Sequence, residues 1–431
     1  MGLRVCMLVV NDVRRDPRVR KEAASLAKVG YDVVVVGVVG EGSGRSEWLD
    51  GYRVMHVQPP RFLRHTPFFR WFTSIRRSSP ASAVRQTDRL ASSSVSLSPG
   101  SSVESISWWR KVSCDIREII YMVRTNWAML RVAGSYSAQI YHVHDLNALI
   151  GGYILSRWQG ARLVYDFHEL FTEQFRPGIK SILWRRFYGF LEGWLGKRAD
   201  SHITVCDSIA GVVRERYAFP MVLTVRNVPW YQLATASPAH GRSGKVILYH
   251  GAYLRDRGLE QLIAAMVHVR EGTLLLRGDG ELETALRVQV HQLDLDSRVV
   301  FAPPVPISEL VQVAADADIG VVPYIGFCLN NRFCLPNKVF EYMMAGLAVA
   351  GSDLPELRNV IARHDIGGLF DPENSRDIAR VLQQLLDDGT ALERMKTNAR
   401  QVARTTYNWE AESVCLVDAY ASIAAKFCGA R

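Results

Sequence analysis

One short segment combines cationic, acidic and amide side chains at the start of a predicted helix. The run LPNKVFEYMMAG begins at Leu335 and places Asn337, Lys338 and Glu341 in its first turns. Backbone N–H groups at a helix N-terminus attract anions, and Lys338 adds a point charge suited to phosphate. A carboxylate at Glu341 can accept hydrogen bonds from two vicinal hydroxyls, such as those of a ribose. The pattern fits a nucleoside diphosphate, and it also fits an ordinary capped helix.

Two glycine-containing loops follow predicted strands in the same half of the chain. The first loop reads GAYLRDRG, in which Gly251 permits a close backbone approach while Arg255 and Arg257 supply cations. The second loop contributes Gly278 and Asp279. Because ligands of parallel α/β sheets bind beyond the carboxyl ends of the strands, we expect both loops to line one crevice.

Histidines and acidic residues follow two predicted strands in the first half of the chain. His142 and His144 lie on the same side of a strand, so a metal site is one interpretation. No third ligand at a diagnostic spacing accompanies them, and a polar pocket for an acceptor substrate is favoured. The residues expected on this acceptor side are Asp12, Arg14, Arg18, His144, Asp145, His168 and Glu169. The first strand-to-helix loop lacks G-x-G-x-x-G, which argues against a dinucleotide cofactor there.

Two parallel sheets are needed to position these residues. The chain has 431 residues, two to three times the usual size of one domain. Buried strands separated by helical stretches are predicted at 3–10, 31–37, 140–144, 163–166, 203–206, 222–225, 245–250, 273–276, 298–301, 319–323 and 347–351. The expected fold class is α/β, with two doubly wound, Rossmann-like domains facing across a cleft. The domains are predicted at 1–228 and 244–405, joined by a hinge at 227–243.

Composition and charge narrow the class of protein. Residues 1–230 carry a net charge of +13 and the remainder −4, so the two halves are expected to meet different partners. The seven cysteines are scattered, which favours reduced thiols over disulfides or a zinc site. No apolar run is long enough for a signal sequence or a membrane span, so a cytoplasmic location is expected.

Two segments have the composition of a membrane interface. Residues 59–135 are predicted to be a low-complexity basic insertion, because an aromatic and basic run is followed by a serine-rich stretch. Helical character is expected to return at 108–111 and 119–131. Residues 179–198 form an amphipathic pattern, with one apolar stripe flanked by lysine and arginine. An ordinary core-facing helix is the favoured interpretation of that stripe, and a helix lying on an anionic membrane is the alternative.

Taken together, these segments resemble the GT-B glycosyltransferases, specifically the retaining family 4 group. The resemblance covers most of the chain except residues 59–135. The similar motifs are DPRVRKEA from 16, HD at 144, DFHE from 166, GAYLRDRG from 251, GDG from 278, ADIGVVP from 317, PNKVFEYMMAG from 336, DLPEL from 353 and YNWE from 407. The resemblance implies that residues 406–431 form a helix that crosses back to the first domain.

The resemblance implies transfer of a sugar from a nucleoside diphosphate sugar with retention at the anomeric carbon, with no cofactor and no obligatory metal. The implied catalytic residues are His144, Arg255, Arg257, Lys338 and Glu341. The implied donor-binding residues are Gly251, Gly278, Asp279, Asn337, Lys338 and Glu341. As the bond to phosphate lengthens, the cations would stabilise the departing diphosphate. His144 would position the reacting groups, and domain closure would exclude water.

The sequence departs from the family pattern at two positions. Where the family has the first glutamate of its E-x7-E pair this chain has Phe333, and Asn330 and Asn331 are candidates to replace it. Where the family has an arginine after the loop glycine this chain has Ala252, which leaves the phosphate contacts to the two arginines that follow. Arg257 falls where the family has lysine.

Several alternatives remain open from the sequence. A catalytically silent nucleotide-sugar-binding scaffold or a GT-B epimerase or hydrolase would share these motifs. The expected partners are a nucleotide-sugar donor, a glycan or lipid-linked acceptor and an anionic membrane surface. We expect no nucleic-acid partner, because the basic half has no recognition motif. The expected location is the cytoplasm, peripheral on the inner face of the cell membrane, with a role in cell-envelope polysaccharide or glycolipid synthesis.

Overall fold

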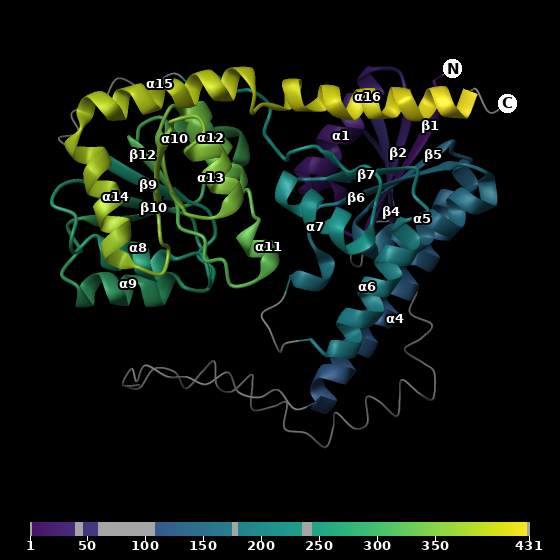
Figure 1. Ribbon diagram of the computed structural model, residues 1–431, viewed down its shortest axis with the longest axis horizontal. Coiled ribbons are helices and arrows are strands. Elements are labelled where there is room, and N and C mark those ends of the chain that lie inside the picture. Colours follow the sequence, from purple (N-terminus) through teal and green to yellow (C-terminus); the bar gives the residue numbers. More distant parts are fainter. Residues whose placement is uncertain (1, 39–45, 59–107, 175–179, 235–243, 429–431) are drawn as a thin grey trace.

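The computed structural model describes residues 2–38, 46–58, 108–174, 180–234 and 244–428. Figure 1 shows two α/β halves, each built around a twisted sheet, with the last helices running along one side of both halves. Successive residues of the central strands pack into different cores: Cys6 and Leu8 on one face of the first sheet, Val5 and Met7 on the other. Both faces are therefore buried, as in a doubly wound fold. The fold class predicted from the sequence is confirmed.

The first half holds an eight-stranded sheet in the order β3-β4-β2-β1-β5-β6-β7-β8. All its neighbouring strands pair in parallel except β3, which is antiparallel to β4. The strands are β1 Arg4–Val9, β2 Asp32–Val38, β3 Ser46–Leu49, β4 Tyr52–Val57, β5 Ile140–His144, β6 Arg162–Phe167, β7 Ser201–Thr204 and β8 Leu223–Thr224. The helices are α1 Pro17–Lys28, α4 Trp108–Ala133, α5 Asp145–Gln159, α6 Ile182–Gly196 and α7 Asp207–Tyr217.

The second half holds a six-stranded parallel sheet in the order β11-β10-β9-β12-β13-β14. Its strands are β9 Val246–His250, β10 Thr273–Arg277, β11 Val299–Ala302, β12 Ile319–Val322, β13 Ala348–Ser352 and β14 Gly367–Phe370. Its helices are α8 Leu259–Ala265, α9 Glu283–Gln292, α10 Leu310–Ala314, α11 Leu329–Arg332, α12 Asn337–Ala345, α13 Pro355–Ile361, α14 Ser375–Asp387 and α15 Gly389–Thr405. The strand order changes direction beside β9, where parallel sheets bind ligands.

Helix α4 corrects the prediction of an insertion at 59–135. Met122 is buried in the core that covers one face of the first sheet. Asn126 donates to a backbone carbonyl of α5 and accepts a backbone N–H from the same helix, both at 2.7 Å. The helix is therefore part of the first half. The helical character expected at 108–111 and 119–131 is confirmed, and only the outer bound of the insertion was wrong. Residues 59–107 lie outside the described residues.

The last helix, α16 (Trp409–Cys428), packs against the first half of the molecule. Trp409 is fully buried, and its indole N–H donates to Ser25 Oγ in α1 at 2.9 Å. Further along α16, the Tyr420 hydroxyl lies 2.7 Å from His142 Nδ1 at the end of β5. The chain thus ends by completing the core of the half in which it began (Figure 1).

Candidate functional site

The six predicted donor-binding residues line one cavity of about 410 Å³ beyond the carboxyl ends of β9 and β10. They are Gly251, Gly278, Asp279, Asn337, Lys338 and Glu341. Each follows a strand or opens a helix, and the parallel sheet brings these points to the same edge. The cavity also includes His250, Arg277 and Tyr324, which sequence analysis did not single out. His250 was detectable as the final residue of a strand that precedes the glycine loop.

The two loop glycines allow the backbones of neighbouring loops to touch. Gly251 has φ +132°, and a side-chain carbon there would lie 3.1 Å from Lys338 Nζ. Gly278 has φ +152°, and a side-chain carbon there would lie 2.1 Å from the carbonyl oxygen of Gly251. Both positions therefore need glycine, and the contact keeps the floor of the cavity open to a ligand.

Lys338 and Arg257 bring two positive charges to one aromatic ring at the cavity. The Lys338 ammonium lies 3.9 Å from the ring centre of Tyr249 and 5.2 Å from that of Tyr324. The Arg257 guanidinium lies 4.1 Å from the Tyr324 ring. Burial and then repulsion by Arg257 lower the pKa of Lys338 to about 7. Within the described ranges neither cation forms an ion pair with a carboxylate, so the two are arranged to receive an external anion.

Glu341 lies one turn after Lys338 and faces the same cavity. Its Oε2 is 2.6 Å from His250 Nε2, and the His250 backbone N–H donates to the Tyr342 hydroxyl at 3.0 Å. Glu341 also lines a second cavity, of about 700 Å³, that runs along α1 between the two halves. The carboxylate is thus held at the junction of the donor cavity and the space between the halves.

Neither loop arginine lines the donor cavity itself. Arg257 stacks on Tyr324, which does line it, whereas Arg255 lies elsewhere, which corrects the prediction that placed the two together. Arg255 lines a separate cavity of about 440 Å³ with Glu260 and Leu282. The left-handed backbone of the intervening Asp256, φ +64°, turns the chain between the two arginines. Of the two loop arginines, only Arg257 shares an aromatic ring with Lys338.

On the acceptor side, a histidine pair lies where β5 and β6 end. His144 Nδ1 is 3.1 Å from His168 Nε2, and Asp145 accepts the backbone N–H of His168 at 2.9 Å. Burial lowers the pKa of His168, but Asp145 and Asp166 outweigh it and raise the value to about 9. Burial and His142 lower the pKa of His144 to about 3. At neutral pH a neutral His144 therefore lies beside a protonated His168.

Exposure differs between these two histidines. The His144 side chain is fully buried, whereas that of His168 is 18% exposed and that of Asp145 32% exposed. Three of the seven predicted acceptor residues therefore come together here. His168 and Asp145 are partly exposed, and His144 supports them from within. A neutral His144 fits the prediction that it positions groups instead of acting as a strong base.

Arg18 is buried inside the first half, which corrects its predicted place on the acceptor surface. Its guanidinium donates to both carboxylate oxygens of Asp166 at 2.9 and 3.0 Å and pairs with Glu22 at 3.0 Å. It also donates to the carbonyl of Val225 at 2.6 Å. Asp16 caps α1 by accepting the backbone N–H groups of Arg18 and Val19. This cap fixes the start of the helix, where Arg18 is the second residue. Arg18 therefore ties the first helix to the strands.

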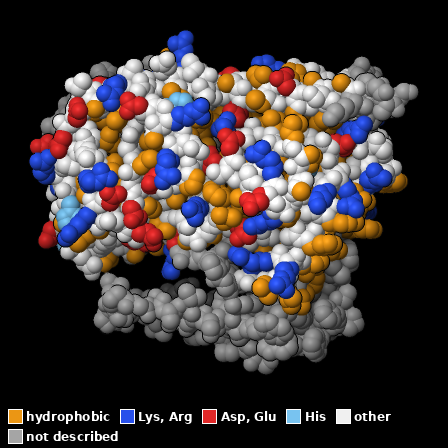
Figure 2. Space-filling model, viewed as in Figure 1, with side chains coloured by type: hydrophobic (Ala, Val, Ile, Leu, Met, Phe, Trp, Pro, Cys, Tyr) orange, Lys and Arg blue, Asp and Glu red, His pale blue; other side chains and the backbone are white. Residues whose placement is uncertain are grey.

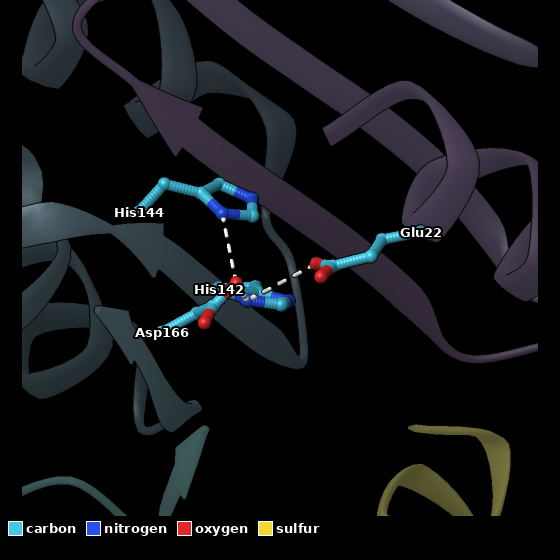
Figure 3. A group of neighbouring side chains, drawn as sticks. All are labelled: Glu22, His142, His144 and Asp166. Carbon is cyan, nitrogen blue, oxygen red and sulfur yellow. Dashed lines mark ion pairs between the residues drawn. The ribbon is translucent and has the colours of Figure 1, made fainter. Parts of the chain in front are cut away.

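Figure 3 shows Glu22, His142, His144 and Asp166 converging from α1, β5 and β6. One ligand atom from each lies within 4.8 Å of the others, which is the donor set of a metal site. The Arg18 guanidinium already bonds both carboxylates and supplies the positive charge that a metal would bring. The cluster thus contains a cation of the chain's own, and we assign it no metal.

The remaining predicted acceptor residues lie outside the sheet, in the 3-10 turn Val13–Arg15 and in the loops beside it and after β6. Asp12 accepts the backbone N–H of Arg14, and the Arg14 side chain forms two hydrogen bonds of 2.8 Å with Glu47 in β3. Arg14 is therefore held by the β3–β4 hairpin and is 58% exposed. Glu169 is exposed and follows His168 on the side of the first half that faces α11.

Comparison with known proteins agrees with this arrangement. Residues 244–388 match the family model described as glycosyl transferases group 1, and residues 16–227 match the glycosyl transferase 4-like domain. Glycogen synthase of Mycobacterium tuberculosis is 22% identical over 297 residues, 66% of this chain and 69% of that protein. A phosphatidyl-myo-inositol mannosyltransferase of Mycolicibacterium smegmatis is 24% identical over 294 residues, covering 66% and 71% of the two chains.

Solved structures share the fold. Sucrose-phosphate synthase of Thermosynechococcus elongatus superposes with a TM-score of 0.72 at 16% identity, covering 98% of this chain and 100% of that chain. Anabaena HepE in complex with UDP and glucose has a TM-score of 0.65 at 14% identity, covering 98% and 100%. Two family models covering most of the chain and a GT-B architecture lead to one conclusion: the chain belongs to the group 1 glycosyltransferases of the GT-B fold.

Proposed function

We propose that this glycosyltransferase moves a sugar from a nucleoside diphosphate sugar to a glycan or lipid-linked acceptor, with retention at the anomeric carbon, in cell-envelope polysaccharide or glycolipid synthesis. The observation that carries the proposal is the pair of cations, Arg257 and Lys338, that share the ring of Tyr324 without a carboxylate partner among the described residues. Like charges this close repel each other, and a diphosphate between them removes the repulsion. Glu341 is placed to bind the ribose hydroxyls.

The proposed reaction follows from where charge develops. The bond between the anomeric carbon and the phosphate oxygen breaks, and the diphosphate keeps the electron pair. Arg257 and Lys338 stabilise this negative charge, so the step needs no resident metal ion. The acceptor oxygen bonds to the same face of the sugar and passes its proton to the departing phosphate oxygen. His168 and Asp145, supported by His144, orient the acceptor at that face.

The activity is tested with the purified full chain, a panel of UDP-, GDP-, dTDP- and ADP-sugars and a membrane extract. We expect nucleoside diphosphate release together with transfer of labelled sugar, and loss of both in Glu341→Ala. Glu393→Ala, an exposed carboxylate on α15, is the matched control and should keep full activity. Analysis of the product by NMR determines whether the anomeric configuration is retained, and an inverted linkage would contradict the proposed mechanism.

A silent nucleotide-sugar-binding scaffold is the second candidate. Ala252 and Phe333, which replace two side chains of the family pattern, favour it. Binding of a nucleotide sugar without turnover, with every acceptor fraction supplied, would support this candidate over the transferase. Release of free sugar or of an epimerised nucleotide sugar would instead identify a hydrolase or an epimerase.

Helix α6 provides the proposed contact with a membrane. The predicted apolar stripe divides between two faces. Leu195 is buried in the core and Leu191 packs against it, as the favoured prediction had it. The other described members are exposed, from 42% for Trp194 to 70% for Phe190, and Ile179 lies outside the described residues. The exposed part of the stripe is formed by Ile182, Leu183, Phe187, Phe190 and Trp194. Figure 2 shows hydrophobic and basic side chains together at the lower right, where Figure 1 places α6. A contiguous apolar surface of this kind marks an interaction site.

The charges beside the stripe define the partner that we propose. Arg186, Lys197 and Arg198 are exposed next to it. The acidic residue of α6, Glu192, is buried and accepts hydrogen bonds from two tyrosines. The exposed face of α6 is thus apolar and cationic, which is the pattern that binds anionic lipid surfaces. No helix of the described residues is long and apolar enough to span a bilayer. We therefore propose a peripheral location on the cytoplasmic leaflet.

Flotation with vesicles of phosphatidylglycerol and phosphatidylcholine tests this contact. We expect the protein to float with anionic vesicles at low salt and to sediment with purely zwitterionic ones. Phe187→Ser combined with Phe190→Ser should abolish flotation. Trp48→Ser combined with Val288→Ser, two exposed apolar residues elsewhere, is the matched control. Equal flotation of both double variants would refute α6 as the contact.

A further inference from the structure

A short segment of the second half reaches across to the loop that carries Glu169. The Asn330 side chain in α11 accepts the backbone N–H of Leu170 through Oδ1 at 3.2 Å. The same carboxamide hydrogen-bonds the carboxylate of Glu169. One asparagine therefore holds both the backbone and the side chain of a loop that belongs to the other half. Asn331 takes no part, because its backbone N–H and carboxamide contact Cys328.

Phe333 explains why α11 lies so close to the first half. Its side chain packs against the core of that half, together with Leu329 of the same segment. The Phe333 carbonyl oxygen lies 3.4 Å from Cys206 Sγ, which donates to it. Residues 329–333, LNNRF, include no carboxylate. The segment eight residues before Glu341 therefore anchors the two halves to each other and offers the donor no acidic group.

Glu169 is an exposed carboxylate between two anchored residues of its loop: His168, which bonds Asp145, and Leu170, which bonds Asn330. Burial and the nearby Asp145 raise its pKa, while His168, Asn330 and Arg257 lower it. Its carboxylate is thus within electrostatic reach of Arg257 on one side and of Asp145 and His168 on the other. In the proposed function, a sugar joined to a diphosphate near Arg257 and approached by an acceptor at His168 would lie near this carboxylate.

We infer that Glu169, held in place by Asn330, is the residue that recognises the hydroxyl groups of the donor sugar. This inference rests on the proposed function and moves Glu169 from the predicted acceptor side to the donor. An ionised carboxylate accepts hydrogen bonds from two adjacent hydroxyls, and it distinguishes sugars whose hydroxyls point differently. Glu169 belongs to the first half, and Asn330, which holds its loop, belongs to the second. The sugar is therefore recognised only while α11 contacts the loop of the first half.

The test compares binding of a nucleotide sugar with binding of the same nucleoside diphosphate by calorimetry. Glu169→Gln and Asn330→Ala should weaken nucleotide-sugar binding about tenfold or more, because a charged hydrogen bond is lost or misplaced, and leave nucleoside diphosphate binding within about twofold. Asn331→Ala, the adjacent asparagine, is the matched control and should change neither. Glu169→Gln should also narrow the difference in affinity between sugars that differ at one hydroxyl.

Three outcomes would overturn the inference. Equal weakening of nucleotide and nucleotide-sugar binding would show that Glu169 acts on the fold of the site and not on the sugar. Unchanged donor binding with a raised KM for the acceptor alone would return Glu169 to the acceptor side. Failure of the unmodified protein to bind any nucleotide would refute the proposed function itself. The first two outcomes would refute only the role of Glu169.

Discussion

The low pKa of Lys338 makes donor binding depend on pH. Its pKa is lowered from 10.5 to about 7 in the free protein, and a bound diphosphate should raise it again because an opposite charge favours the ammonium form. The ammonium fraction falls from about nine-tenths at pH 6 to about one-tenth at pH 8. Affinity for the donor should therefore fall about tenfold over that range, with uptake of about half a proton on binding at pH 7.

Calorimetry in buffers of different ionisation enthalpy measures both quantities. A nucleotide sugar is the right ligand, since a free terminal phosphate would itself titrate near pH 6 and obscure the result. Lys338→Arg keeps the charge at all these pH values, so its affinity should be independent of pH and its binding should take up no proton. Lys21, whose pKa is also about 7, remains in that variant and serves as an internal check.

A donor affinity of the unmodified protein that stays constant from pH 6 to pH 8 would refute control of donor binding by Lys338. That control would equally be refuted if Lys338→Arg retained the full pH dependence, because the titrating group would then be Lys21 or another residue. In either case Lys338 would be charged or neutral throughout, and its burial beside Arg257 would not control the binding of the diphosphate.

Three further predictions concern the framework of the site. Arg18→Met leaves the carboxylate of Asp166 buried without its cation and should lower the free energy of unfolding by about 3–5 kcal/mol; a loss below about 1 kcal/mol in urea titration would contradict the network. Tyr420→Phe removes the hydroxyl beside His142 Nδ1 and should cost about 1–3 kcal/mol without changing nucleotide affinity, measured by the same titration and by calorimetry. Gly258→Ala adds a carbon 2.0 Å from a backbone oxygen at φ +66°, and should displace the arginine loop and weaken donor binding, so an unchanged Kd would show that the loop tolerates the strain.

The donor cavity could be predicted because its residues are marked locally. Gly251 and Gly278 directly follow β9 and β10, and Lys338 opens α12. In a parallel sheet the ends of strands meet at one edge whatever the lengths of the helices between them. Local spacing therefore located the cavity residues without knowledge of the side-chain contacts.

Other features depend on contacts that local spacing does not encode. The partner of Arg18 is Asp166, 148 positions later, so the burial of Arg18 could not be predicted from the first turn of α1 alone. Arg255 and Arg257 differ because of one left-handed residue between them. The stripe on α6 has the same pattern whether it is covered or exposed, and only the surrounding helices decide between the two.

The position of α16 bears on how the chain folds during synthesis. Trp409 fills a fully buried place against α1, and its backbone N–H bonds the carbonyl of Pro229 at 2.9 Å. The ribosome makes the rest of the first half roughly 180 residues before it makes this tryptophan, which at about 5–20 residues per second is a delay of about 10–40 s. During that time the apolar surface that Trp409 later covers is exposed to solvent. The first half can therefore complete its core only after α16 has been made, so nascent chains expose an apolar surface that chaperones can bind.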